Sequence, residues 1–158
     1  SGQLIFYEPL SGGYKSQWGS INKRKDFEEF QSINVNAITL HTAIVRAVNS
    51  SNIDSKIALW IDVEGATYDV LVGSDKLVQE NISVVFAELN DTQAYESSAT
   101  SIKVIDYMLN AGFVPIARDN EWQDAWNIVF IHESLVPSLQ EIILPWLAEE
   151  ARLISKGL

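Results

Sequence analysis

Acidic side chains follow two apolar runs of this sequence, and their types and spacing could do chemistry. Asp62 and Glu64 come directly after the apolar run 57–61, and Glu88 follows the apolar run 82–87. A carboxylate can accept the proton that a reacting hydroxyl group releases. It can also orient that hydroxyl by accepting a hydrogen bond from it. These three residues are therefore the first candidates for a catalytic or binding site.

His41 is a fourth candidate, because imidazole titrates near neutral pH and can act as a base. Each candidate also has an ordinary structural role. His41 could be a polar surface residue at a helix start, Asp62 could cap the helix that follows it, and Glu64 could favour the first turn of that helix. The three carboxylates could also share a metal ion through oxygen ligands, as in a metal hydrolase. Their spacing does not by itself indicate a metal, so we expect none.

The runs that precede the acidic residues have the pattern of buried strands. Residues 57–61 and 82–87 are apolar without alternation, which is typical of strands covered on both faces of a parallel sheet. Apolar residues then recur at helical spacing over 66–78, with an interruption at Gly73–Ser74, and over 102–109. In open α/β sheets, ligands bind beyond the carboxyl ends of the strands. The acidic residues are expected at that rim.

The remaining segments complete an alternation of strands and helices. We expect strands at 3–8, 33–39, 113–117 and 125–131, and helices at 40–48 and 137–154, with Pro145 kinking or splitting the last helix. This alternation predicts an α/β fold with a mostly parallel sheet and helices on both faces. The connection between the last two strands is too short for a crossover, so one of them should run antiparallel.

Composition and charge limit the classes of function. The 158 residues are 47% hydrophobic and 20% charged, which predicts a single globular domain. We expect that domain to consist of a strand and loop (1–32), a core (33–131) and a helical tail (132–158). The net charge of -10 disfavours nucleic acids and anionic membranes as partners. The sequence has no cysteine and no apolar run that could span a bilayer, so we expect a cytoplasmic protein.

Residues 61–66, which read Ile-Asp-Val-Glu-Gly-Ala, resemble the signature of the FkbM methyltransferases. Further agreements are Val70–Leu71, Gly73, the strand that ends in Thr39–Leu40, the strand that ends in Glu88, Gly112–Phe113 and residues 126–130, so the similarity extends from about residue 35 to residue 131. The resemblance implies the Rossmann-like class I methyltransferase fold. It also implies methyl transfer from S-adenosylmethionine to a hydroxyl oxygen of a small molecule or glycan. Asp62 would then lie near the methyl donor, and Glu88 could close the acceptor pocket.

The sequence departs from that family's pattern in the cofactor region. The family's glycine-rich turn after its first strand has no counterpart, and Glu8–Pro9 matches the ribose-binding position only by its letters. Cofactor-binding residues therefore stay unknown. We expect the chain to correspond to the C-terminal portion of such a domain, and we expect this polypeptide alone to show no measurable binding of S-adenosylmethionine. Other departures are Trp60, His41 and Thr67, where the family usually has Lys, Asp and Glu.

Two functions stay open at this point. The chain could be part of an O-methyltransferase that binds a hydroxyl-bearing acceptor. Alternatively, it could be a non-catalytic folded remnant that binds no cofactor and pairs with a second copy of itself. The second possibility rests on the strand at 57–62, whose flank is open unless the strands at 3–8 and 33–39 cover it. A symmetric homodimer through that exposed sheet edge would protect it.

Overall fold

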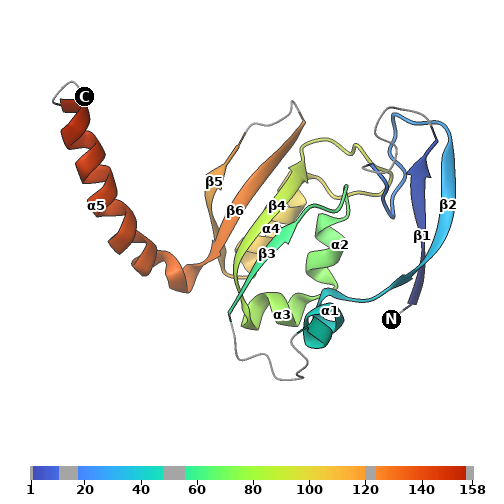
Figure 1. Cartoon of the computed structure of the whole chain (residues 1–158), viewed down its shortest axis with the longest axis horizontal. Coiled ribbons are helices and arrows are strands. Elements are labelled where there is room, and N and C mark those ends of the chain that lie inside the picture. Colours follow the sequence, from blue (N-terminus) through green and yellow to red (C-terminus); the bar gives the residue numbers. More distant parts are fainter. Residues whose placement is uncertain (1, 11–17, 48–55, 120–123, 156–158) are drawn as a thin grey trace.

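Two separate sheets lie in the described part of the chain (Figure 1). The computed structural model describes residues 2–10, 18–47, 56–119 and 124–155. In the first sheet, β1 (Gly2–Pro9) pairs antiparallel with β2 (Phe30–Ala37). The second sheet has four strands in the order β3–β4–β6–β5. Their bounds are β3 (Ile57–Ile61), β4 (Ile82–Asn90), β5 (Phe113–Arg118) and β6 (Ala125–His132).

The apolar core lies between the four-stranded sheet and three helices. Val85, Ala87 and Leu89 alternate along β4 and are all buried. The helices that cover them are α2 (Thr67–Val72), α3 (Asp75–Glu80) and α4 (Ser101–Asn110). They contribute Leu71, Leu77, Val78, Val104 and Met108 to the same cluster. Period-2 burial along a strand places these helices on one face of the sheet.

The predicted α/β class holds, but the prediction of a mostly parallel sheet is wrong. Among the described strands, β3 and β4 pair in parallel, whereas β6 pairs antiparallel with both β4 and β5. The expected antiparallel strand therefore exists, and it is β6. Because β6 lies between β4 and β5 rather than at an edge, it makes two of the three pairings antiparallel.

The prediction of helices on both faces is also wrong for the described residues. Trp60 on β3 is 76% exposed, and its ring packs on that of Phe86 with centroids 4.4 Å apart. The run 57–61 is thus apolar on both faces but covered on one. An unbroken apolar run does not reveal which of its faces is buried, because its hydrophobicity does not alternate.

Most helices and strands agree with the sequence predictions within a few residues. The interruption at Gly73–Ser74 separates α2 from α3, and Pro115 lies in the edge strand β5. The helix predicted over 40–48 is α1 (Leu40–Ala47), and residue 48 lies outside the described residues. No described helix is long and apolar enough to cross a lipid bilayer.

The C-terminal helix has nearly its predicted bounds, and of the two effects predicted for Pro145, a kink or a split, the split is wrong. A short 3₁₀ helix, η1 (Glu133–Leu135), leads into α5 (Val136–Ser155), which continues through Pro145 and is not split. It extends away from the sheet (Figure 1), and Ile142 on it is 71% exposed.

The first sheet does not pair with the second in the described residues. β1 and β2 pair with each other, and β3 is an edge strand of the four-stranded sheet. The N-terminal segment instead reaches the second sheet through loops. Tyr7 pairs with Ser20, and Arg24 forms an isolated antiparallel bridge with Tyr95, in the loop after β4. These loop contacts bring residues 18–26 to the carboxyl ends of β3 and β4.

Asp91 joins three elements just after β4. Its Oδ1 accepts hydrogen bonds from Ser101 Oγ at 2.6 Å and from Trp126 Nε1 at 2.8 Å. Both donors belong to buried residues. The hydrogen bond from Ser101, followed by that from Trp126, lowers the pKa of Asp91. The Asp91 carboxylate therefore stabilises the fold fully at a pH above the ordinary pKa of an aspartate. This stabilisation is lost as the pH falls through the lowered pKa of Asp91 in the folded protein.

We expect Asp91→Ala to lower the free energy of unfolding by about 1–3 kcal/mol at pH 7, because two buried donors lose their acceptor. Urea unfolding measures this change through the transition midpoint. Asp106→Ala is the matched control, since Asp106 lies exposed on α4. Equal midpoints for the two variants would contradict the role given to Asp91.

Candidate functional site

A cavity of about 780 Å³ lies where β3 and β4 end. Its acidic lining residues are Asp26, Asp62, Glu64, Glu88 and Asp124, and its basic ones are Arg24 and Lys25. Its aromatic lining residues are Trp18, Trp60, Phe86, Tyr95 and Trp126. The cavity therefore combines an excess of negative charge with aromatic walls, a lining suited to a small molecule that carries both polar and apolar groups.

The parallel register of β3 and β4 brings the predicted acidic residues together. Ile61 lies opposite Ala87 in this register. The residues that follow them, Asp62 and Glu88, are therefore at the same level of the sheet. One carboxylate oxygen each from Asp62, Glu64 and Glu88 lies within 4.8 Å of the others. The structure thus gathers three of the four predicted site residues at one rim.

The turn that carries Glu64 has a rare backbone conformation. Glu64 has a φ of 47° and Gly65 a φ of 82°, so both lie in the left-handed region. The ring of Tyr95 packs directly on Gly65, because a Cβ atom there would lie 2.4 Å from Tyr95 Cδ2. On the other side, Ser20 Oγ donates a hydrogen bond of 2.6 Å to the carbonyl oxygen of Glu64. Contacts from two distant segments therefore hold this turn.

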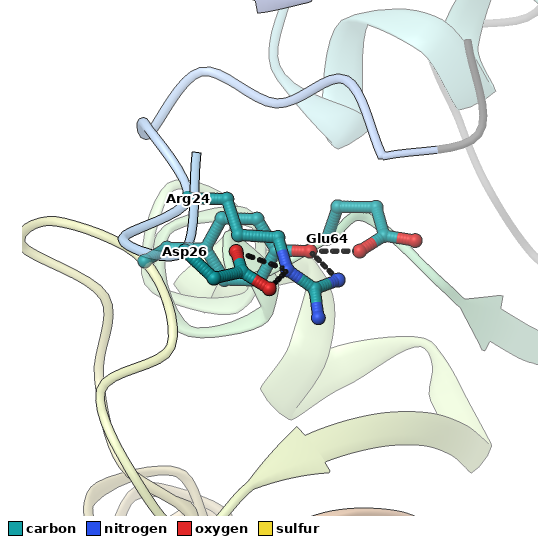
Figure 2. Close-up of polar contacts among 4 residues, drawn as sticks. Arg24, Asp26 and Glu64 are labelled. Atoms are coloured by element: carbon teal, nitrogen blue, oxygen red, sulfur yellow. Dashed lines mark hydrogen bonds and ion pairs between the residues drawn. The ribbon is translucent and has the colours of Figure 1, made fainter. Parts of the chain in front are cut away.

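A polar network connects Glu64 to the N-terminal segment (Figure 2). The Tyr95 hydroxyl donates a hydrogen bond to Glu64 Oε2. Arg24 Nη1 lies 3.5 Å from the same hydroxyl oxygen and donates to it. Arg24 Nε in turn donates to both carboxylate oxygens of Asp26, at 2.9 and 3.1 Å. The positive charge nearest to Glu64 in this network is therefore already paired with an acidic side chain.

Burial and neighbouring charges act on Glu64 in opposite directions. Burial raises the pKa of Glu64, and the negative charge of Asp62 raises it further, whereas Tyr95 and Arg24 lower it. The net result is a pKa above the ordinary glutamate value. Burial, followed by the hydrogen bond to Glu64, likewise raises the pKa of Tyr95, so the phenol stays protonated and remains a donor. A carboxyl with a raised pKa in a cavity is a candidate proton acceptor.

The structure also bears on the other roles considered for His41 and Asp62 and on the surroundings of Glu88. His41 is exposed on α1 and does not line this cavity, so the structure does not bring it to the three carboxylates. The capping role considered for Asp62 is not observed, because the N-cap of α2 is Ala66 and no side chain caps it. Glu88 connects the site to α2 through its carbonyl oxygen, which accepts a hydrogen bond from Thr67 Oγ1 at 3.0 Å.

The sequence predictions missed Tyr95 and the role of Arg24. Tyr95 lies in a polar loop with no periodic pattern, and its partners are 31 and 71 residues away. The basic run 23–25 is a visible signal in the sequence, and by itself it is consistent with a solvated loop or with a contact for an acidic group of a substrate. The structure shows that Arg24 contacts acidic and phenolic groups of the protein itself.

Among the described residues, these three carboxylates form the group whose side-chain oxygens lie close enough together to share a cation. We assign no metal to them, because close acidic groups are common without one. The chemistry of the cavity is compatible with a sulfonium cofactor, since aromatic faces and carboxylates both attract cations.

Comparison with known proteins gives one family. The model of the family described as Methyltransferase FkbM domain matches residues 6–115. The match begins within β1 and ends within β5, so it includes every carboxylate of the three-residue group and also Tyr95. Neither a curated protein nor a solved structure matches the chain.

Proposed function

Because this chain belongs to the FkbM methyltransferase domain family, we propose that it acts in the transfer of a methyl group from S-adenosylmethionine to a hydroxyl oxygen. The acceptor would be a small molecule or a glycan, bound in the cavity at the ends of β3 and β4. The observation that carries this proposal is the convergence of Asp62, Glu64 and Glu88, whose oxygens lie within 4.8 Å of one another inside the matched residues.

Glu64 is the proton acceptor in this proposal. A general base works best when its pKa is close to the working pH. Burial and the charge of Asp62 move the pKa of Glu64 upward, toward that range. Asp62, which is more exposed, would orient the acceptor hydroxyl by accepting a hydrogen bond. Glu88, on β4, would close the acceptor site on the side of the sheet.

The aromatic walls support an acceptor with apolar surface between its hydroxyl groups. Trp60 lies two residues before Asp62 in the sequence, and its ring packs at a tilt against that of Phe86 in the lining of the cavity. Trp126 lies on the neighbouring strand, β6. Flat aromatic side chains beside carboxylates give contact area and hydrogen-bond acceptors together. Binding in this position would orient the hydroxyl for reaction, which supplies much of the rate in a displacement between two molecules.

S-adenosylmethionine, when bound, supplies a methyl group on a cationic sulfur. The acidic, aromatic cavity fits such a cation, but the sequence contains no glycine-rich turn of the family type. The lining of the cavity changes the expectation from no measurable binding to weak binding, with a dissociation constant of about 1 mM, or about -4 kcal/mol. Titration calorimetry with S-adenosylmethionine measures it, and S-adenosylhomocysteine, which lacks the cationic sulfur, is the control ligand.

The outcomes of this titration separate the two functions. Weak binding that favours the sulfonium compound supports the proposal, and micromolar binding would show that the chain needs no such turn. No heat at millimolar concentrations, together with a dimer in gel filtration, would contradict the proposal and support the non-catalytic homodimer. The open edge of β3 is where that dimer would form.

A further inference from the structure

Tyr95 connects the proposed proton acceptor to a segment far away in the sequence. We propose that Tyr95 is a positioning residue, whose hydroxyl holds one carboxylate oxygen of Glu64 so that the other oxygen faces the acceptor. This inference rests on the proposed function, which makes Glu64 the proton acceptor. The contact between Tyr95 and Glu64 does not depend on that role. Its support comes from the burial of Tyr95, its two polar partners and the backbone around it.

The ring of Tyr95 is fixed in place. It is 2% exposed, and it fills the space in front of Gly65, where a side chain would have to lie. The loop that carries it is anchored at both sides by the N-terminal segment. Lys25 N donates to the carbonyl oxygen of Ala94 at 2.9 Å, and Glu96 N donates to that of Lys23 at 2.7 Å. A buried ring between two such anchors leaves its hydroxyl little freedom to move.

The hydroxyl of Tyr95 connects two opposite charges. It donates to Glu64 Oε2 and accepts from Arg24 Nη1. Figure 2 shows that the second carboxylate oxygen of Glu64 points away from this network. A phenol that accepts from a guanidinium is a better donor to a carboxylate, because neighbouring hydrogen bonds polarise one another. The network therefore distinguishes the two oxygens of Glu64.

The same contact affects the charge of Glu64. The charged and titratable groups around Glu64 are Asp62, Glu88, Tyr95 and Arg24, and Arg24 is paired with Asp26. Burial and Asp62 favour the protonated carboxyl, whereas the hydrogen bond from Tyr95 and the charge of Arg24 favour the carboxylate. Removing the hydroxyl should therefore make Glu64 protonate at a higher pH. A merely structural role of the ring would not produce this change.

The test is a ¹³C NMR titration of the glutamate side-chain carboxyl carbons in the whole chain. The resonance of Glu64 is assigned by its loss in Glu64→Gln. Tyr95→Phe keeps the ring against Gly65 and removes the hydroxyl. We expect an upward shift of the Glu64 titration midpoint in this variant, and a smaller upward shift in Arg24→Met. Tyr107→Phe is the matched control, because the hydroxyl of Tyr107 donates to Leu71 O in the core and does not contact Glu64.

An unchanged or lowered midpoint in Tyr95→Phe overturns the inference, as does an equal shift in Tyr107→Phe. If Tyr95→Phe does not fold, the ¹³Cζ resonance of Tyr95 in the unmodified chain decides the question: it should move with the Glu64 titration midpoint and lose that step in Glu64→Gln, and a Tyr95 resonance without such a step overturns the inference. The titration needs neither cofactor nor acceptor, so a failure to find methyl transfer leaves its result valid. Where methyl transfer is measured, kcat/KM of Tyr95→Phe should fall more at low pH than at high pH, because the base form of Glu64 is lost earlier.

Discussion

Glu64→Gln is expected to lower the rate of methyl transfer by about 10²–10⁴-fold at neutral pH, the usual contribution of a general base. The amide keeps the shape of the side chain and can still accept the hydrogen bond from Tyr95, so the turn should remain intact. It cannot accept the proton that the acceptor hydroxyl releases. The rate is followed with radiolabelled S-adenosylmethionine at millimolar concentration, because binding is expected to be weak.

Two further variants test whether a loss of rate in Glu64→Gln is specific to Glu64. Glu29→Gln is the matched control, since Glu29 is exposed and does not line the cavity, and its rate should equal that of the unmodified chain. Asp62→Asn should have a smaller effect than Glu64→Gln, because Asp62 orients the hydroxyl and does not take its proton. A larger loss of methyl-transfer rate in Asp62→Asn than in Glu64→Gln would show that Asp62 accepts the proton and that Glu64 orients the hydroxyl.

Gly65→Ala is expected to lower the free energy of unfolding by about 2–4 kcal/mol, from two additive causes. Gly65 has a φ of 82°, where an alanine is strained by about 1 kcal/mol. Its new Cβ would also lie 2.4 Å from Tyr95 Cδ2, and displacing a buried ring costs about 1–3 kcal/mol. The variant should further lose the contact between Tyr95 and Glu64, because the ring has to move.

Gly112→Ala separates these two causes. Gly112 has the same φ of 82°, but the nearest atom to its added Cβ is His132 Nε2, at an ordinary distance of 3.5 Å. This control should therefore lose only the roughly 1 kcal/mol of backbone strain. Chemical denaturation of both variants measures the difference. Equal losses would show that Tyr95 does not pack against Gly65 in solution.

The local features of the fold could be predicted because they depend on nearby residues. Apolar runs and helical spacing located β3, β4, α2, α3 and α4. They also placed Asp62 directly after β3, whereas β4 continues two residues past Glu88. The signature at 61–66 indicated the family, and the family match over residues 6–115 confirms it. Neighbouring parallel strands end at one rim, so the convergence of the carboxylates followed from strand order.

The remaining features depend on contacts between distant residues. The position of β6 between β4 and β5 is a matter of topology, and no local pattern specifies it. The exposure of Trp60 depends on what covers the sheet, which a run such as 57–61 does not encode. Tyr95 reaches the site through a loop whose backbone is hydrogen-bonded to Lys23 and Lys25, in a distant segment of the sequence. For these reasons the acidic residues at the ends of β3 and β4 could be predicted from the sequence, but the residues that hold them in position could not.

The most direct test of this account is the product of methyl transfer. The chain is incubated with millimolar radiolabelled S-adenosylmethionine and a set of small-molecule and glycan acceptors, and each product is identified by mass spectrometry. The account predicts an O-methyl ether on one class of hydroxyl acceptor, formed at a rate that Glu64→Gln reduces and Glu29→Gln does not. Methylation of amines alone, or an O-methyl product formed equally well by Glu64→Gln, would contradict it.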